Sequence, residues 1–215
     1  MKIVAFADSH GRHKKIKKLP GGMPEGDVLV VAGDFSPKGE IEMVHSFANW
    51  LGKLPHKEKI VVAGNHDKTF ESGDLRCLAE GYIKNVAHYL IDSEVVINGV
   101  KFYGSPWQPA FCNWAFNLPR GERLRKVWQA VPEDTDVLIT HGPPMGILDV
   151  PIYKEEHVGC ADLEEELGRI KPKVHIFGHI HHSYGMVEKD GTRFYNSSVV
   201  GEDYKVANPV HVIEV

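Results

Sequence analysis

The segment Lys59-Ile60-Val61-Val62-Ala63-Gly64-Asn65-His66-Asp67 joins a short apolar run to a polar tetrapeptide. The apolar residues predict a buried strand, and the amide, imidazole and carboxyl groups of Asn65, His66 and Asp67 follow at the point where that strand would stop. These groups can bind a divalent metal ion and can also move a proton. The same residue types form ordinary polar turns, so the segment needs support from elsewhere in the chain.

The same pattern, an apolar run followed by residues that can bind a metal, occurs four more times. In open α/β sheets, ligands bind beyond the carboxyl ends of the strands. Five such strand ends therefore predict one shared site. The other four are Ile3–Ala7 followed by Asp8 and His10, Val28–Ala32 followed by Asp34, Val137–Thr140 followed by His141, and Val174–Phe177 followed by His179 and His181.

Length and composition indicate an ordinary globular protein. The 215 residues, 42% hydrophobic and 25% charged, suit a single domain spanning 1–215. The formal net charge of −4 counts against strong attraction to an extended nucleic acid. A basic segment, Arg12–Lys18, is interpreted as the solvated face of a helix that turns Ile16 and Leu19 inward.

The cysteines and the apolar runs indicate the cellular compartment. Cys77, Cys112 and Cys160 are too few and too far apart for a disulfide framework or a zinc knuckle, so we expect buried, reduced thiols. The chain starts with a predicted strand instead of a signal peptide, and no apolar run approaches the ~20 residues of a membrane helix. We therefore expect a cytoplasmic protein that does not bind membranes.

Strands and helices alternate along both halves of the chain. Residues 41–51, 74–80, 121–130 and 163–170 are predicted to be helical, and hairpins are predicted to turn at Asn98-Gly99 and Asp190-Gly191. Residues 210–215 are predicted to form a terminal strand. This pattern favours mixed sheets with helices on the outside. The aromatic residues of the long loop 104–118 either pack on the core or stack on an aromatic substrate, and core packing is favoured.

Five motifs follow one another between residues 8 and 181: Asp-x-His, Gly-Asp, Gly-Asn-His-Asp, an isolated His-Gly and Gly-His-x-His. In this order they resemble the blocks of the calcineurin-like metallophosphoesterase superfamily. That resemblance implies an α/β fold, a four-layer α-β-β-α sandwich with two mixed β-sheets. Segments 104–107, 117–121 and 158–160 resemble the metallophosphoesterase-domain-containing proteins, a subfamily near the class III cyclic nucleotide phosphodiesterases. Some of its members carry Gly at the position of His179, and retention of His179 favours full catalytic competence.

The resemblance also implies a centre of two divalent metal ions, which anionic and imidazole ligands would hold about 3.5–4 Å apart. Its ligands would come from all five motifs, with Asp34 bridging the ions. Imidazole and carboxylate ligands suit Mn, Fe, Zn, Co or Ni, with Mn favoured. Alternation along an extended Gly-His-x-His segment would send both imidazoles to one side, and Gly33, Gly64 and Gly178 would allow sharp turns. The expected ligands are Asp8, His10 and His181 for one ion and Asn65, His141 and His179 for the other.

The same resemblance implies how the reaction would proceed. A hydroxide bridging the ions would attack phosphorus in line with the leaving group. His66 would protonate that group or stabilise charge on the phosphoryl oxygens. Asp67 would orient the His66 ring and hold its proton. Arg12, His13, Asn65 and His66 are the candidate substrate contacts. Arg12 and His13 could contact a phosphate, and a solvated surface role is the alternative for these two.

The leading functional hypothesis is a metal-dependent phosphodiesterase that hydrolyses a small phosphodiester or nucleotide, with cyclic nucleotides as candidates. A nuclease or a phosphomonoesterase with the same site is one alternative. A non-catalytic regulatory protein that binds a nucleotide or a metal is another. Taken singly, Asp8 and Asp34 could cap helices and His141 could sit in a buried turn. The oligomeric state is not indicated by the sequence.

Overall fold

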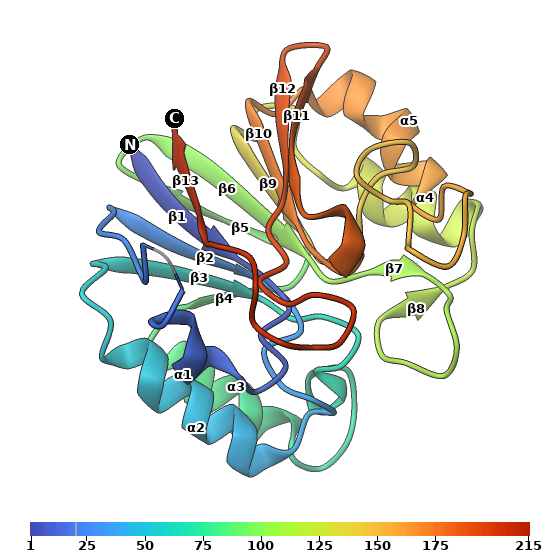
Figure 1. Ribbon diagram of the computed structural model, residues 1–215. Helices are drawn as coiled ribbons and strands as arrows, with labels where there is room; N and C mark the ends of the chain where they lie inside the picture. The colour runs from blue at the N-terminus through green and yellow to red at the C-terminus, as the bar shows by residue number, and fades with distance from the viewer. Residues whose placement is uncertain (20) are drawn as a thin grey trace.

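The computed structural model describes residues 1–19 and 21–215, and two β-sheets face each other at its centre (Figure 1). The first sheet has the strand order β13-β1-β2-β3-β4 and the second has the order β11-β12-β10-β9-β6-β5. The first sheet contains β1 (Lys2–Phe6), β2 (Val28–Ala32), β3 (Glu58–Val62), β4 (His88–Leu90) and β13 (His211–Glu214). The second contains β5 (Ser93–Ile97), β6 (Val100–Ser105), β9 (Val137–Thr140), β10 (Val174–Phe177), β11 (Gly185–Lys189) and β12 (Thr192–Asn196).

Both sheets are mixed. Strands β1 to β4 run parallel, and β13 joins β1 in antiparallel register, with Ile3 opposite Ile213. In the second sheet β12, β10, β9 and β6 run parallel, and the edge strands β11 and β5 are antiparallel to their neighbours. A small pair, β7 (Gln108–Pro109) and β8 (Asn117–Leu118), lies in the loop that follows β6. The parallel strands are what place several carboxyl ends at one edge.

Hydrophobic side chains divide between the faces of each sheet because successive residues of a strand point to opposite sides. In β1, Ile3 and Ala5 enter the core between the sheets, whereas Val4 and Phe6 face the helices. Helices α1 (His13–Ile16), α2 (Ile41–Gly52) and α3 (Arg76–Lys84) cover the outer face of the first sheet (Figure 1). Helices α4 (Glu122–Gln129) and α5 (Ala161–Ile170) cover the second. The layers are therefore α-β-β-α, as predicted.

The predicted helices and hairpins are present, with shifted boundaries. The helix expected over 74–80 runs from Arg76 to Lys84, because Ala79 and Ile83 are both buried against the first sheet and draw the helix further along the chain. The basic segment after Arg12 forms only the short α1, which buries Ile16 as expected.

Two further findings concern the surface. Cys160 is buried, but Cys77 and Cys112 are exposed, so the expectation of three buried thiols was wrong for two of them. Among the described residues no helix combines the length and the apolar character needed to cross a membrane.

Candidate metal centre and active site

The side chains expected to bind metal lie together at the carboxyl ends of five strands. Strands β1, β2 and β3 supply them from the first sheet, and β9 and β10 supply them from the second. The site therefore sits where the two sheets meet at one end of the molecule, and neither sheet could build it alone. Three groups of potential ligands have their donor atoms within 4.8 Å of one another: Asp8 with His10 and His181, His10 with Asp34 and His66, and Asp34 with His141 and His179.

The first group is compact and buried. His10 Nε2 lies 3.2 Å from His181 Nε2, and His181 Nε2 lies 3.9 Å from Asp8 Oδ1. Asp8 is fully buried, and its Oδ1 has no hydrogen-bond partner among the described residues, whereas its Oδ2 accepts from the backbone N–H of His179 at 2.9 Å. A buried carboxylate oxygen without a donor, next to two imidazole nitrogens, suits a bound cation.

Asp34 connects this group to the group that contains His141 and His179. Its Oδ2 lies 3.7 Å from His10 Nε2 and 3.4 Å from His141 Nε2. His141 Nδ1 donates to the carbonyl of Ala32, which leaves Nε2 for the site, 2.9 Å from the amide oxygen of Asn65. One carboxylate placed between two donor groups is the arrangement that a bridging ligand requires.

The backbone at these strand ends is unusually strained. Asp8, His10, Asp34 and His179 all have positive φ angles, of 58°, 40°, 52° and 70°. Non-glycine residues adopt this left-handed conformation at a cost of order 1 kcal/mol, and such residues concentrate at functional sites. The Gly-His-x-His segment is therefore not the extended strand that the sequence analysis assumed. His179 turns back sharply, and His181 begins the 3-10 helix η2 (His181–Ser183), so the two imidazoles serve different groups.

The glycines beside the ligands are needed for space more than for their backbone angles. Of the three glycines expected to allow sharp turns, Gly33 has a left-handed conformation, with φ of 91°, whereas Gly64 and Gly178 do not. A Cβ atom on Gly64 would lie 2.2 Å from Asp34 Oδ1, and one on Gly178 would lie 2.3 Å from Asp8 Oδ2. Any side chain at these positions would displace a carboxylate from the site.

Burial keeps most of the imidazoles uncharged. It lowers the pKa of His10 and of His179 to about 3, and that of His181 to about 4. At neutral pH these rings are therefore neutral and can offer a lone pair to a cation, as metal binding requires.

The pKa values of the two carboxylates and of His141 are set by their mutual charges as well as by burial. Burial raises the pKa of Asp8 to about 7, with Asp34 adding to the rise. Burial would also raise the pKa of Asp34, but the neighbouring His141 holds it well below its usual range. The pKa of His141 is lowered by burial and raised by Asp34, with a net rise to about 9. Buried anions that depend on nearby positive charge suit divalent ions such as Mn, Fe, Co, Ni or Zn, and the residues present fit such ions.

His66 lies beside the cluster and is held on three sides. Its Nδ1 donates to the carbonyl of Pro37 at 2.6 Å, its ring stacks on Trp114 with centroids 3.9 Å apart, and its backbone N–H donates to Asp34 Oδ1 at 2.8 Å. Because a carbonyl can only accept, Nδ1 carries a hydrogen and Nε2 remains free to gain or lose a proton. The ring is therefore held in one orientation next to the predicted metal ligands.

Asp67 does not orient the His66 ring, contrary to the sequence analysis. It is fully buried, its Oδ1 accepts from the backbone N–H and the hydroxyl of Ser36, and its Oδ2 accepts from the backbone N–H of Gly64. The orienting acceptor for His66 is instead the carbonyl of Pro37. Asp67 acts one step away, because it fixes the segment that carries this carbonyl.

Arg12 and His13, the candidate phosphate contacts, do not lie at the metal-ligand cluster. His13 is buried, with its ring against Phe47 and Trp50, so it packs in the core beneath α2. Arg12 donates to the backbone carbonyl of His10 at 3.3 Å and is not among the residues that line the cavity. Both residues follow His10 closely in sequence, but the left-handed turn at His10 directs the chain after it away from the metal-ligand cluster.

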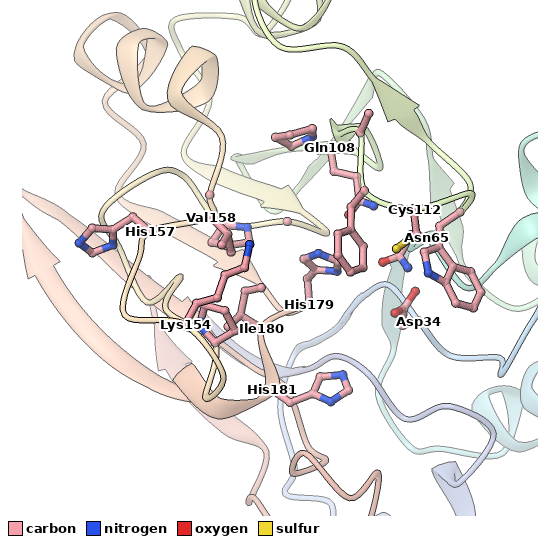
Figure 2. Close-up of a pocket in the computed structure, with 18 of the residues that line it drawn as sticks. Asp34, Asn65, Gln108, Cys112, Lys154, His157, Val158, His179, Ile180 and His181 are labelled. Atoms are coloured by element: carbon pink, nitrogen blue, oxygen red, sulfur yellow. The ribbon is translucent and has the colours of Figure 1, made fainter.

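A cavity of about 570 Å³ opens over the cluster (Figure 2). Asp34, Asn65, His66, His179 and His181 line its inner end. The aromatic residues of loop 104–118 lie in two different surroundings. Phe116 is buried and Trp107 packs against the core, whereas Phe111 and Trp114 line the cavity.

Several other residues of the cavity were not predicted from the sequence. Tyr204 lies on the loop between β12 and β13, and its ring contacts His10 and His181, with centroid distances of 4.8 and 5.1 Å. His157 and Lys154 lie on the long segment between β9 and α5. These residues stand far from the motifs in sequence, and nothing near them marks a strand end, so only the fold reveals them.

This fold and this cluster of carboxylates and imidazoles define a metal-dependent phosphoester hydrolase. The profile of the family described as Calcineurin-like phosphoesterase matches residues 1–183, and the chain belongs to that family. It is 41% identical to the human and mouse proteins named metallophosphoesterase domain-containing protein 1, over its whole length and 71% of theirs. It is 36% identical to a UPF0046 protein of Caenorhabditis elegans, over its whole length and 60% of that protein.

The fold is also found in solved structures of low sequence identity. The crystal structure of TT1561 of Thermus thermophilus has a TM-score of 0.62 at 14% identity, covering 91% of this chain and 88% of that one. A second crystal structure has a TM-score of 0.74 at 18% identity and covers 99% of this chain and 98% of the other.

Proposed function

We propose that the protein is a phosphodiesterase with a centre of two divalent metal ions, and that it hydrolyses a small phosphodiester such as a cyclic nucleotide. The observation that carries this proposal is the position of Asp34 between two groups of ligands, with the free Nε2 side of His66 next to them. Divalent ions held by these side chains would lower the pKa of a bound water towards ~7 and draw charge from the phosphoryl oxygens.

His66 would donate the proton that the leaving group needs, which the metal ligands do not provide. An ester whose leaving group is an alkoxide needs a proton at the departing oxygen, and an oriented imidazole donates one well near neutral pH. The Pro37 carbonyl fixes the proton of Nδ1, so the proton that moves is the one on Nε2. Trp114, stacked on the ring, keeps water from one of its faces.

The charge of the cavity supports a diester over a monoester. Outside the ligand cluster its lining includes two cations, Lys154 and Arg120, and two anions, Glu156 and Glu202. Arg120 already donates to the carbonyls of Val158 and Gly159 at 2.8 and 2.7 Å. A dianionic monoester would favour an excess of free cations, whereas a diester carries a single negative charge and needs room for a second organic group.

The proposal is tested by preparing the protein without metal, reloading it with Mn²⁺, Zn²⁺, Fe²⁺, Co²⁺ or Ni²⁺, and assaying a panel of phosphate esters. The panel contains bis-p-nitrophenyl phosphate, p-nitrophenyl phosphate, 2′,3′- and 3′,5′-cyclic mononucleotides, and single- and double-stranded DNA. We expect metal-dependent hydrolysis of diesters that exceeds that of the monoester. Faster monoester hydrolysis, or tight and salt-sensitive DNA binding with cleavage, would assign the site to a phosphomonoesterase or a nuclease instead.

A further inference from the structure

The cavity extends beyond the metal cluster to an outer end formed by the segment 151–159. Figure 2 shows His157 and Lys154 on the opposite side of the pocket from Asp34 and Asn65. This outer end uses none of the side chains that the proposed reaction requires. Its chemistry therefore needs an explanation of its own.

His157 is oriented by a buried carboxylate. The His157 side chain is 55% exposed, whereas that of Asp149 is fully buried, and Nδ1 of His157 donates to Asp149 Oδ1 at 2.5 Å. The other oxygen of Asp149 accepts from the backbone N–H groups of Gly146 and Gly159 at 3.0 and 2.9 Å. These bonds place the hydrogen of His157 on Nδ1, so Nε2 presents a lone pair on the other side of the ring.

The segment that follows His157 is fixed from the opposite side as well. Arg120 donates from its two terminal nitrogens to the carbonyls of Val158 and Gly159, and the Val158 N–H donates to the Asp149 carbonyl at 3.2 Å. A charged side chain and a buried carboxylate therefore hold a short stretch of loop. Such support gives a side chain one orientation, which is what recognition of a ligand requires.

Two other exposed histidines, His88 and His45, lack this construction. His88 pairs with Glu58, which is itself partly exposed, and His45 contacts Asn49 one turn along the same helix. Both are solvated pairs of the kind that contributes little. His157 combines a buried orienting partner with a place in the reaction cavity, and its Nε2 has no hydrogen-bond partner among the described residues.

The surroundings of His157 suit a flat organic group more than a second anion. Phe111 and Tyr153 line the same cavity with 46% and 67% of their surfaces exposed. Lys154 extends into the pocket in Figure 2, but Glu156 lines the cavity too and balances its charge. Exposed aromatic faces stack on planar rings, and a fixed acceptor selects a group that carries an N–H or O–H.

We infer that His157, held by Asp149, is a specificity-determining residue that accepts a hydrogen bond from an N–H or O–H on the organic part of the ester. Phe111 and Tyr153 contact the faces of that organic group, so its class is a planar, hydrogen-bond-donating group such as a nucleoside. This inference rests on the proposed phosphodiesterase function and adds the residue by which the site would recognise its substrate. Asp149 is a positioning residue, because it acts through His157.

The test compares His157→Phe, which keeps a ring but removes the acceptor, with His157→Gln, whose side-chain carbonyl can accept again. The matched control is His88→Phe, at an exposed histidine outside the cavity. For each metal-loaded protein, kcat and KM are measured with cyclic mononucleotides of all four bases and with bis-p-nitrophenyl phosphate. We expect His157→Phe to raise KM for the preferred nucleotide about tenfold, the effect of losing one hydrogen bond, with kcat and metal content within about twofold.

Three further results support or refute the inference. KM for bis-p-nitrophenyl phosphate should stay within about twofold, and His157→Gln should recover part of the nucleotide affinity. An unchanged nucleotide KM in His157→Phe, or a parallel loss with both substrates, would overturn the role of His157. Calorimetric binding of nucleoside monophosphates to wild type and His157→Phe gives a readout without turnover, so failure of the proposed hydrolysis and failure of this inference can be told apart.

Discussion

Replacing His66 by Asn tests the proton donor directly. Asn cannot move a proton at neutral pH, and loss of general acid catalysis typically costs 10²- to 10⁴-fold in rate, about 2.7 to 5.5 kcal/mol of transition-state stabilisation. The loss applies only where the leaving group needs a proton. We therefore expect a fall of this size in kcat for cyclic nucleotides, whose leaving group is an alkoxide, and a much smaller fall for bis-p-nitrophenyl phosphate.

The structure also predicts that this variant folds. His66 makes one ring hydrogen bond, to the Pro37 carbonyl, and one stacking contact, with Trp114. Losing them costs about 1 kcal/mol for the hydrogen bond and about 0.5–1.5 kcal/mol for the aromatic contact. That total is small beside the 5–15 kcal/mol typical of a folded domain. The backbone N–H bond to Asp34 remains, so metal content should be preserved.

The assay measures kcat for both substrate types, with metal content by elemental analysis and the thermal unfolding midpoint as controls. Equal losses for alkoxide and nitrophenolate leaving groups would refute proton donation by His66. Loss of bound metal in His66→Asn would instead assign the residue to the ligand set.

Three other predictions concern the site and the core. Gly64→Ala places a methyl group 2.2 Å from Asp34 Oδ1 and should weaken metal binding at least tenfold. The control Gly81→Ala has open space around its new methyl group and should bind metal as wild type does. Equal metal affinities of the two variants in a titration would contradict the clash at Gly64. Metal binding at pH 7 should release between about one and two protons, because His141 (pKa about 9) and Asp8 (pKa about 7) must deprotonate. Calorimetry in buffers of different ionisation enthalpy measures this number, and release of no proton would contradict the assigned protonation states. Burial lowers the pKa of His175 from 6.5 to about 3, so the unfolded chain takes up a proton before the folded chain does, and the free energy of unfolding falls as the pH drops below about 6.5. Between pH 7 and pH 5, the free energy of urea unfolding of the metal-free wild type should fall by about 2 kcal/mol more than that of His175→Phe. If the two proteins show the same pH dependence, His175 is not a buried neutral ring.

The strands and the positions of the metal ligands could be predicted from the sequence because both depend on local residue patterns. Apolar runs such as Val28–Ala32 mark strands, and the polar residue after each run marks its carboxyl end, so parallel pairing brings the ligands of each sheet to one edge. The packing of the two sheets on each other then joins the two sets of ligands. All the residues expected to bind metal lie in the cluster, at the ends of β1, β2, β3, β9 and β10.

What the sequence did not predict depends on contacts between distant segments. The acceptor that orients His66 is a backbone carbonyl at Pro37, which carries no side-chain signal, whereas the carboxylate of Asp67 accepts from Ser36 and Gly64. His13 follows the first ligand motif, but a left-handed turn sends it into the core. His157 and Asp149 show their relation only once the loop between β9 and α5 is folded.

The proposed function depends on Asp34, which we propose joins two groups of ligands into one hydrolytic centre for phosphodiesters. The measurement that tests it most directly is the metal stoichiometry of wild type and Asp34→Asn, determined together with the rate of bis-p-nitrophenyl phosphate hydrolysis. We expect two ions per chain and metal-dependent turnover in wild type, with turnover reduced at least a hundredfold and at least one ion lost in Asp34→Asn. A wild-type protein that binds no divalent metal and cleaves no phosphodiester would contradict it.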